Sequence, residues 1–394
     1  MNDPRKTRLL ERARLVRRLR AAGNHFYERT LESVDGAWIT LNGERYLQFC
    51  SYSYLGLNSK LELIEEAVSL SQSFRSGSGG TRVVCGTTTL HLELEREIAG
   101  WLGTEQCVLL PSGFSANSTL LAALSSPGDH IFADQSVHAS IKDGLHLTRC
   151  EPEFFQHQDI ADLRSRLEKP GDGVKWVVVD GVYSMDGDIA PLPDLQRLCD
   201  EFGAFLYVDD AHGLGVLGAE GAGVHQHFGV KVGPFELLMG TISKSIPSIG
   251  GFAAGSGDLI DALRGNCRSF IFSSSTPPID TALALTAIRH LRANGDLLHT
   301  LWDRQKTYVD LLAANGLRAL NIATPIVPLM CRDNAQAFAI TKYCEARKLL
   351  VLPAIFPVVP LDAPRIRTTV TAAMTREDFA FAVDVLAEAF AQTA

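Results

Sequence analysis

The runs Trp176-Val-Val-Val-Asp180, Leu192-Pro-Asp-Leu-Gln-Arg-Leu-Cys-Asp-Glu-Phe202 and Phe205-Leu-Tyr-Val-Asp209 decide the fold. The first and third runs are short and apolar, which is typical of parallel strands buried on both faces. The middle run repeats its apolar residues at helical spacing, at Leu192, Leu195, Leu198 and Phe202. Strand, helix and strand form a βαβ unit, so the pattern predicts an α/β protein whose mainly parallel sheet is covered on both faces.

Further apolar runs extend this alternation. Gln106-Cys-Val-Leu-Leu110 and His130-Ile-Phe-Ala133 predict two more strands of the same sheet. A chain of 394 residues exceeds a single core, because cores stop growing near roughly 250–300 residues. We expect an N-terminal helix and hairpin over residues 1–49, with the hairpin turn at Asn42-Gly43. A large domain over residues 50–284 and a small α+β domain over residues 285–394 follow.

Composition narrows the class of partner. A net charge of −8 argues against general nucleic-acid binding, which requires a dominant basic face. No apolar run reaches the roughly 18–20 residues of a membrane helix, and the N-terminus lacks the apolar core of a signal peptide. We therefore expect a cytoplasmic protein that acts on small molecules. The eight cysteines form no CxxC pair, which favours reduced thiols and no metal site.

The first twenty residues predict a basic amphipathic helix. Apolar residues recur at helical spacing at Leu9, Leu10, Ala13, Val16 and Leu19. Arginines fill much of the remainder, at Arg8, Arg12, Arg14, Arg17, Arg18 and Arg20. The helix is interpreted either as a solvated helix docked on the body or as a basic rim for an anionic substrate or peripheral membrane contact.

A lysine and an aspartate carry the strongest chemical signal. Lys244 stands among small hydroxyl residues in Gly240-Thr-Ile-Ser-Lys-Ser245, where its amine can form a Schiff base while the hydroxyls contact a phosphate. Asp209 ends an apolar strand and is followed by Asp210 and His212. A carboxylate there can keep a pyridine nitrogen protonated, although a helix cap or turn is the structural alternative. Together the two residues favour pyridoxal 5′-phosphate.

Two more strand ends supply a phosphate site and a stacking ring. Pro111-Ser-Gly-Phe-Ser-Ala-Asn117 leads from a strand into a helix, whose free N–H groups and glycine suit a phosphate. His138 follows another strand, where its imidazole can stack on an aromatic cofactor. A plain turn and a satisfied structural histidine are the respective alternatives, so the prediction depends on all four segments occurring together.

Eight motifs, in this order, resemble the α-oxoamine synthase family of fold-type-I pyridoxal-phosphate enzymes. They are Ser53-Tyr-Leu-Gly-Leu57, Gly77-Ser-Gly-Gly-Thr-Arg82, Ser112-Gly-Phe-Ser-Ala-Asn117, Asp180-Gly-Val-Tyr-Ser-Met-Asp-Gly187, Val208-Asp-Asp-Ala-His-Gly213, Gly240-Thr-Ile-Ser-Lys-Ser245, Phe272-Ser-Ser-Ser-Thr-Pro-Pro278 and Arg365-Ile-Arg-Thr-Thr-Val-Thr-Ala-Ala373. The resemblance runs from about Tyr46 to the C-terminus. It implies a large domain with a mainly parallel seven-stranded sheet flanked by helices, a small α+β C-terminal domain and a short N-terminal segment.

The resemblance also implies roles for four catalytic residues. Lys244 resembles the Schiff-base lysine that also serves as the base for the α-proton, and Asp209 resembles the partner of the pyridinium nitrogen. His212 would donate a hydrogen bond to the phenolic oxygen of the cofactor. His138 would stack on its ring.

Further motif positions are implied to bind the cofactor or the amino acid. The phosphate would contact the amides of Gly113 and Phe114, the hydroxyl of Thr241 and, from the second subunit, Ser274. Ser184 resembles the family's serine near the ring. Arg367 resembles its clamp for the amino-acid carboxylate, which suits a planar guanidinium, and Ser53 falls in the substrate-binding segment.

The implied reaction is a decarboxylating Claisen condensation of serine, alanine or glycine with an acyl thioester, giving an aminoketone. The resemblance implies coenzyme A or an acyl carrier protein as the carrier, and a homodimer with a shared active site. Two stretches are closer to serine palmitoyltransferase than to other members, Gly240-Thr-Ile-Ser-Lys-Ser-Ile-Pro-Ser-Ile-Gly-Gly-Phe252 and Pro353-Ala-Ile-Phe-Pro-Val-Val-Pro360. Departures from the family pattern bear on the substrates, at Tyr52-Ser53 where an asparagine is usual, at Ile246-Pro247 and at Met374.

Three alternatives remain open at this point. An 8-amino-7-oxononanoate synthase-like enzyme would use other substrates in the same reaction. An aminotransferase or aldolase would share the lysine and the aspartate but need no thioester. A non-catalytic regulatory subunit would have kept the fold and lost the chemistry.

Overall fold

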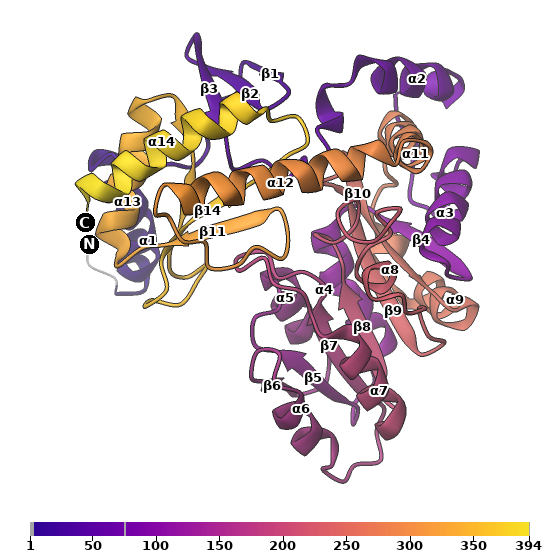
Figure 1. Ribbon diagram of the computed structural model, residues 1–394. Coiled ribbons are helices and arrows are strands. Elements are labelled where there is room, and N and C mark those ends of the chain that lie inside the picture. The colour runs from indigo at the N-terminus through magenta and orange to yellow at the C-terminus, as the bar shows by residue number, and fades with distance from the viewer. Residues whose placement is uncertain (1–3, 75, 394) are drawn as a thin grey trace.

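The computed structural model describes residues 4–74 and 76–393 of the chain. Figure 1 shows two lobes, one built around a large sheet and the other containing both ends of the chain. The long helix α12 (Asp296–Ala314) runs along the second lobe toward the first.

The large sheet has seven strands in the order β4-β10-β9-β8-β7-β5-β6. The strands are β4 (Gln106–Leu110), β5 (His130–Asp134), β6 (Pro152–Phe155), β7 (Lys175–Asp180), β8 (Phe205–Asp209), β9 (Glu236–Ser243) and β10 (Pro247–Gly255). Strand β10 is antiparallel to β4 and β9, and the remaining neighbours are parallel. The four predicted strands are all present, and the α/β fold with a mainly parallel seven-stranded sheet is confirmed.

Helices cover both faces of this sheet (Figure 1). The helices of this lobe are α2 (Leu61–Ser71), which packs on α11, then α3 (Thr89–Leu102), α4 (Gly113–Leu124), α5 (Ala139–Leu147), α6 (Ile160–Leu167), α7 (Leu192–Phe202), α8 (Val224–Phe228), α9 (Gly257–Asn266), α10 (Arg268–Phe272) and α11 (Pro278–Ala293), with short 3₁₀ turns η1 (Leu57–Ser59) and η2 (Gln72–Phe74). Alternate strand residues face opposite sides, so Val177 and Val179 join one apolar cluster while Trp176 and Val178 join the other.

The second lobe has its own apolar core around the three-stranded sheet β11-β14-β13. Its elements are β11 (Ile326–Met330), β13 (Leu352–Ala354), β14 (Arg365–Thr369), α12, α13 (Asn334–Ala346) and α14 (Arg376–Gln392). A further short strand, β12 (Leu349–Leu350), pairs in parallel with β3 (Glu44–Gln48). The N-terminal hairpin therefore shares a sheet with the C-terminal part of the chain.

The hairpin turn lies where the sequence predicts it. Strands β1 (Ser33–Asp35), β2 (Trp38–Leu41) and β3 form an antiparallel meander, and the turn residues Asn42 and Gly43 both have positive φ, 51° and 76°. This conformation is typical of tight hairpins. The predicted boundary after residue 284 falls inside α11, which packs against α2 and α3. The division into three regions stays a prediction.

The basic N-terminal segment is a helix, α1 (Pro4–Ala21), next to α13 (Figure 1). Its expected apolar face is only partly covered, because Ala13 and Leu19 are half-buried whereas Leu10 and Val16 are exposed. The side chains of Arg8, Leu9 and Arg12 lie outside the described part of the structure. Across the described residues, none of the helices has the length and apolar character needed to cross a membrane.

Candidate active site

The carboxyl ends of five strands border one cavity of about 300 Å³, a size ordinary for a small-molecule site. Strands β4, β5, β7, β8 and β9 all end at this edge of the sheet, as expected for an α/β ligand site. The cavity includes seven of the predicted site residues, Gly113, Phe114, His138, Asp209, His212, Thr241 and Lys244. It also includes polar residues not predicted for the site, Ser112, Asn117, Ser140, Asp180 and Ser243.

Lys244 follows β9 in the tight connection to β10. The pKa of its amine falls from 10.5 to about 8, chiefly because of burial, with Asp209 and Asp180 opposing the shift and Arg367 adding to it. At pH 7 roughly a tenth of the amine is then neutral, about 300-fold more than for an ordinary lysine. The neutral amine is the nucleophilic form, so this environment suits covalent chemistry.

Asp209 is fixed by hydrogen bonds to both carboxylate oxygens. Its Oδ2 accepts from Nδ2 of Asn117 at 2.6 Å, and its Oδ1 accepts from the backbone N–H of Ala211 at 3.0 Å. Asn117 is itself oriented by the Tyr207 hydroxyl, which donates to Oδ1 at 2.6 Å. The neighbouring Asp210 does not line the cavity, and its Oδ2 accepts from a backbone N–H of α8. The geometry therefore favours Asp209 over Asp210, as the sequence did.

His138 is the N-cap of α5, and its ring is held by Ser140. Its Nδ1 accepts from the backbone N–H of Ser140 at 3.2 Å and lies 2.6 Å from the Ser140 hydroxyl. Burial lowers the pKa of His138. The backbone N–H of Ser140 points at Nδ1, so this nitrogen is an acceptor and Nε2 carries the ring proton. Ser140 also accepts a hydrogen bond from Asn117, which links the cavity-lining residues His138 and Asp209 through one network.

His212 is held by a residue that the sequence analysis missed, Tyr54. The Tyr54 hydroxyl lies 2.7 Å from Nδ1 of His212, and both residues are buried. Burial raises the pKa of Tyr54 to about 12 and lowers that of His212 well below its usual range. A protonated phenol donating to a neutral imidazole leaves the imidazole proton on Nε2. His212 can thus donate from Nε2, the role expected from the sequence.

The N-terminus of α4 borders the cavity next to the end of β9. Ser112 caps α4, and the first N–H groups of a helix have no partner within the helix. A Cβ added to Gly113 would lie 3.1 Å from Cβ of Thr241, so glycine permits the close approach of helix and strand. The Thr241 hydroxyl bonds to the carbonyl of Gly250 and to Ser243.

Arg367, on β14, extends from the second lobe toward this cavity. Its Nε donates to the carbonyl of Ser184 at 2.6 Å and its Nη1 donates to Thr369 Oγ1 at 2.8 Å. Its Nη2 is buried without a hydrogen-bond partner among the described residues. The adjacent Arg365 pairs with Asp186 in the same loop as Ser184. An unpaired, buried guanidinium nitrogen is costly, so the site is suited to an incoming carboxylate.

The structure does not bring Ser53 or Ser274 to this cavity. The Ser53 hydroxyl donates to Oδ1 of Asn58 at 3.0 Å, and the adjacent Tyr52 faces Arg367 instead. Tyr52 thus lies beside Arg367, and the substrate-binding role of Ser53 stays a prediction. Ser274 pairs with Thr81 outside the cavity. Its predicted role belongs to a second subunit and stays a prediction.

Met374 is fully buried in the apolar core of the second lobe, so this departure from the family pattern serves packing rather than the cavity.

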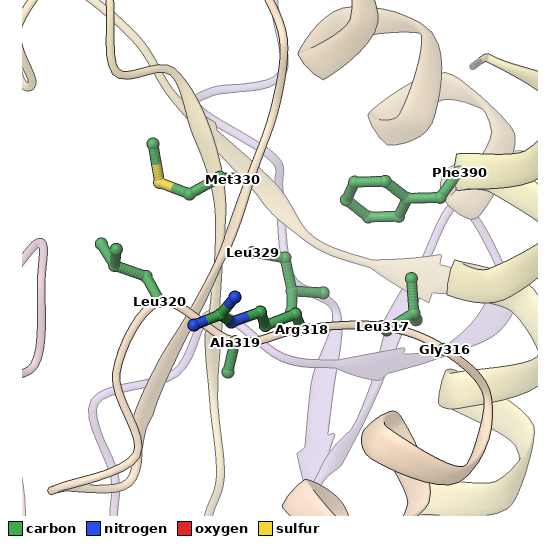
Figure 2. A pocket seen from close by; sticks show the side chains of 8 residues that line it. All are labelled: Gly316, Leu317, Arg318, Ala319, Leu320, Leu329, Met330 and Phe390. Carbon is green, nitrogen blue, oxygen red and sulfur yellow. The ribbon is translucent and has the colours of Figure 1, made fainter.

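A separate cavity of about 430 Å³ lies in the second lobe (Figure 2). It is lined by Gly316, Leu317, Arg318, Ala319, Leu320, Leu329, Met330 and Phe390. It holds a single ionisable side chain, Arg318, and none of the predicted site residues.

The fold and the lysine–aspartate cavity define the chain as a fold-type-I transferase. Residues 44–386 match the family described as aminotransferase class I and II. The chain is 37% identical to 8-amino-7-oxononanoate synthase of Thermosipho melanesiensis, over 94% of this chain and 95% of the relative. It is 36% identical to serine palmitoyltransferase of Bacteroides thetaiotaomicron, over 95% of each.

Solved structures agree with these relatives. Serine palmitoyltransferase from S. paucimobilis, with a bound PLP-myriocin aldimine, superimposes with a TM-score of 0.94 at 28% identity over 98% of both chains. The chain belongs to the aminotransferase class I and II family, as one of its α-oxoamine synthases. The resemblance read from the motifs is confirmed, and the family depends on pyridoxal phosphate.

Proposed function

We propose that the chain is a pyridoxal-phosphate enzyme that condenses a small amino acid with an acyl thioester and releases carbon dioxide. One observation carries the proposal: a lysine amine of depressed pKa, a hydrogen-bonded aspartate and a helix N-terminus border one cavity, with an unpaired arginine N–H nearby. The residues present suit the cofactor, because the first amides of α4, the amine of Lys244 and the carboxylate of Asp209 all border the same cavity.

When bound, pyridoxal phosphate accepts the electron pair of a carbanion at the substrate's α-carbon. Lys244 holds the cofactor covalently and, once free, its amine removes the α-proton. Asp209 keeps the pyridine nitrogen protonated, and the network through Asn117 fixes the direction of its carboxylate. His212, whose Nδ1 is held by Tyr54, would donate from Nε2 to the phenolic oxygen, and the ring of His138, held by Ser140, would cover one face of the cofactor.

The remaining residues orient the ligands. The N–H groups of Gly113 and Phe114 would bind the phosphate, and the Thr241 hydroxyl, which donates to the carbonyl of Gly250, would turn to join them. Arg367 binds the amino-acid carboxylate through its free Nη2, and the carbonyl of Ser184 holds the guanidinium in place.

The overall reaction balances without a further reactant. The bond from the α-carbon to the carboxylate breaks with loss of carbon dioxide, a bond from the α-carbon to the acyl carbon forms, and the thiol leaves. The product is an aminoketone. Each change at the α-carbon requires a carbanion, which explains why a protonated pyridine nitrogen beside Asp209 is needed.

Within the family we favour a serine palmitoyltransferase-like enzyme. The fit to serine palmitoyltransferase, with a TM-score of 0.94, and the stretches around Lys244 and Pro353 support this choice. The alternative is an 8-amino-7-oxononanoate synthase-like enzyme, which the equally similar curated relatives support. We also propose a cytoplasmic homodimer in which Ser274 of one subunit completes the site of the other, and a peripheral membrane contact through the exposed arginines of α1.

A substrate matrix tests the proposal. The purified protein is incubated with glycine, alanine or serine and with short, long or carboxylated acyl groups on coenzyme A or acyl carrier protein. We expect free thiol and carbon dioxide to appear together for at least one pair, and neither to appear with Lys244→Ala. If no pair releases thiol, the proposed condensation is wrong.

A further inference from the structure

His157 follows β6 and lies between two carboxylates from different parts of the large lobe. Its Nδ1 is 3.0 Å from Oδ1 of Asp134, the last residue of β5, and its Nε2 is 2.8 Å from Oδ2 of Asp188. Asp134 is fully buried and also accepts two backbone N–H groups. The ring of Tyr183 packs edge-on against the imidazole, with 4.4 Å between centroids. His157 therefore joins the end of a central strand to the segment that contains Asp188.

The imidazole of His157 is a cation in this setting. Both ring nitrogens face carboxylate oxygens, and only the imidazolium can donate from both. Although burial opposes the charge, the hydrogen bonds to Asp134 and Asp188 raise the pKa of His157 from 6.5 to about 10. Hydrogen bonds between ionised groups are about twice as strong as neutral ones, so the contact with Asp188 is a strong one.

Asp188 ends a compact loop, residues 183–188. The N–H of Tyr183 donates to the carbonyl of Asp188 at 3.0 Å, and the N–H of Gly187 donates to the carbonyl of Tyr183 at 2.8 Å. A Cβ added to Gly187 would lie 2.6 Å from the carbonyl oxygen of Ile326, so the loop packs tightly against the start of β11. From the large lobe, Asp188 is bound by His157 and by Nε2 of Gln158.

The same loop binds the arginines of the second lobe. Arg365 pairs with Asp186, and Nε of Arg367 donates to the carbonyl of Ser184 at 2.6 Å. The remaining nitrogen of that guanidinium, Nη2, is buried without a hydrogen-bond partner among the described residues. The position of the loop therefore sets the direction in which Arg367 presents this nitrogen.

We infer that His157 is a positioning residue for the amino-acid site: its ring anchors the loop 183–188 to the sheet, and the loop aims the Arg367 guanidinium at the substrate carboxylate. His157 itself is not among the residues that border the cavity, so it acts through the loop. The inference rests on the proposed function only in that a carboxylate binds to Arg367. It requires nothing of the acyl thioester.

Two substitutions separate the two hydrogen bonds of His157. The amide nitrogen of His157→Gln can take the place of Nε2 and keep the contact with Asp188, whereas that of His157→Asn reaches only toward Asp134. The change in visible absorption when alanine is added to the cofactor-loaded enzyme gives a Kd for each. We expect the Kd to rise about five- to twentyfold in His157→Asn and by less than about twofold in His157→Gln, because only the first releases the loop. The control His227→Asn alters an exposed histidine of α8 and should leave the Kd unchanged.

A double-mutant cycle separates positioning from general damage. Arg367→Lys lacks the planar guanidinium that the Ser184 carbonyl orients, so adding His157→Asn to it should raise the Kd by less than about twofold. Asp188→Ala breaks the same link from the loop side and should reproduce the rise seen in His157→Asn, which keeps the test available should that variant fail to fold.

Two results would overturn the inference. One is an equal Kd in His157→Asn and His157→Gln, and the other is the same rise for His157→Asn with arginine or lysine at position 367. Thiol release bears on the condensation alone. The expected pattern of Kd without thiol release would refute the condensation and leave the role of His157 standing, whereas thiol release with an equal Kd in the two variants would do the reverse.

Discussion

Replacing Lys244 by methionine should stabilise the cofactor-free protein at neutral pH. Burial lowers the pKa of this lysine from 10.5 to about 8, so its charged form is disfavoured in the folded state. Between these two pH values the unfolded chain binds a proton that the folded chain does not, and the free energy of unfolding therefore rises with pH. The buried lysine therefore lowers the free energy of unfolding by about 3 kcal/mol below pH 8, and this destabilisation disappears above pH 10.5.

Lys244→Met removes this cost while keeping a similar side-chain volume. We expect its free energy of unfolding at pH 7 to exceed that of the wild-type apoprotein by about 3 kcal/mol, and the difference to shrink as the pH approaches 10.5. Urea unfolding of both apoproteins at a series of pH values measures it. The control is Lys306→Met, at a lysine whose side chain is 74% exposed and pairs only with Asp310, and it should show no such gap.

The same pKa governs how the cofactor is taken up. Because the neutral amine is the reacting form, the rate of covalent pyridoxal-phosphate incorporation into the apoprotein should rise about tenfold per pH unit below pH 8 and then level off.

Two results of the unfolding experiment would refute the reasoning about the buried amine. One is a Lys244→Met apoprotein less stable than the wild type at pH 7, and the other is a difference in free energy of unfolding that does not depend on pH.

Three other substitutions give distinct outcomes. Asp209→Asn should slow exchange of the substrate α-proton with deuterated water at least 100-fold, as followed by NMR, whereas Asp210→Asn should mainly lower the unfolding temperature; equal exchange rates would contradict the assignment. Tyr54→Phe leaves Nδ1 of His212 unpaired, so it should lower the free energy of unfolding by about 1–3 kcal/mol. It should also shift the pH titration of the cofactor's visible absorption, and an unchanged titration would argue against the proposed tautomer of His212. Arg367→Lys should raise the KM for the amino acid about 10- to 100-fold with a smaller change in kcat, and a pure loss of kcat would show that the arginine acts elsewhere.

The sequence predicts several strands of the sheet and the sheet edge at which the site lies, because both depend on local sequence pattern. Apolar runs identified β4, β5, β7 and β8, and a parallel sheet brings its carboxyl ends together, so Asp209 and His138 were predicted at one edge of the sheet. Antiparallel β10 was not predicted, because its glycine-rich sequence has no clear alternation. The pairing of β3 with β12 joins segments about 300 residues apart, which no local pattern reveals.

The supporting residues of the site were missed for the same reason. Tyr54 lies 158 residues from His212, and Asn117 lies 92 residues from Asp209, so nothing local in the sequence links each pair. The segment around Ser53 was identified as substrate-binding, but only the structure shows that Tyr52 is the residue turned toward Arg367 and Lys244. Side-chain direction in an irregular segment depends on tertiary packing rather than on spacing.

Mapping the attachment point of the cofactor tests the central claim most directly. The pyridoxal-phosphate-loaded protein is reduced with borohydride, digested with a protease and analysed by mass spectrometry. We expect one peptide to carry the pyridoxyl phosphate group, with the modification on Lys244, and the visible absorption band to disappear on reduction. Modification of another lysine, or a protein that binds no cofactor, would contradict the assignment of this cavity as the active site.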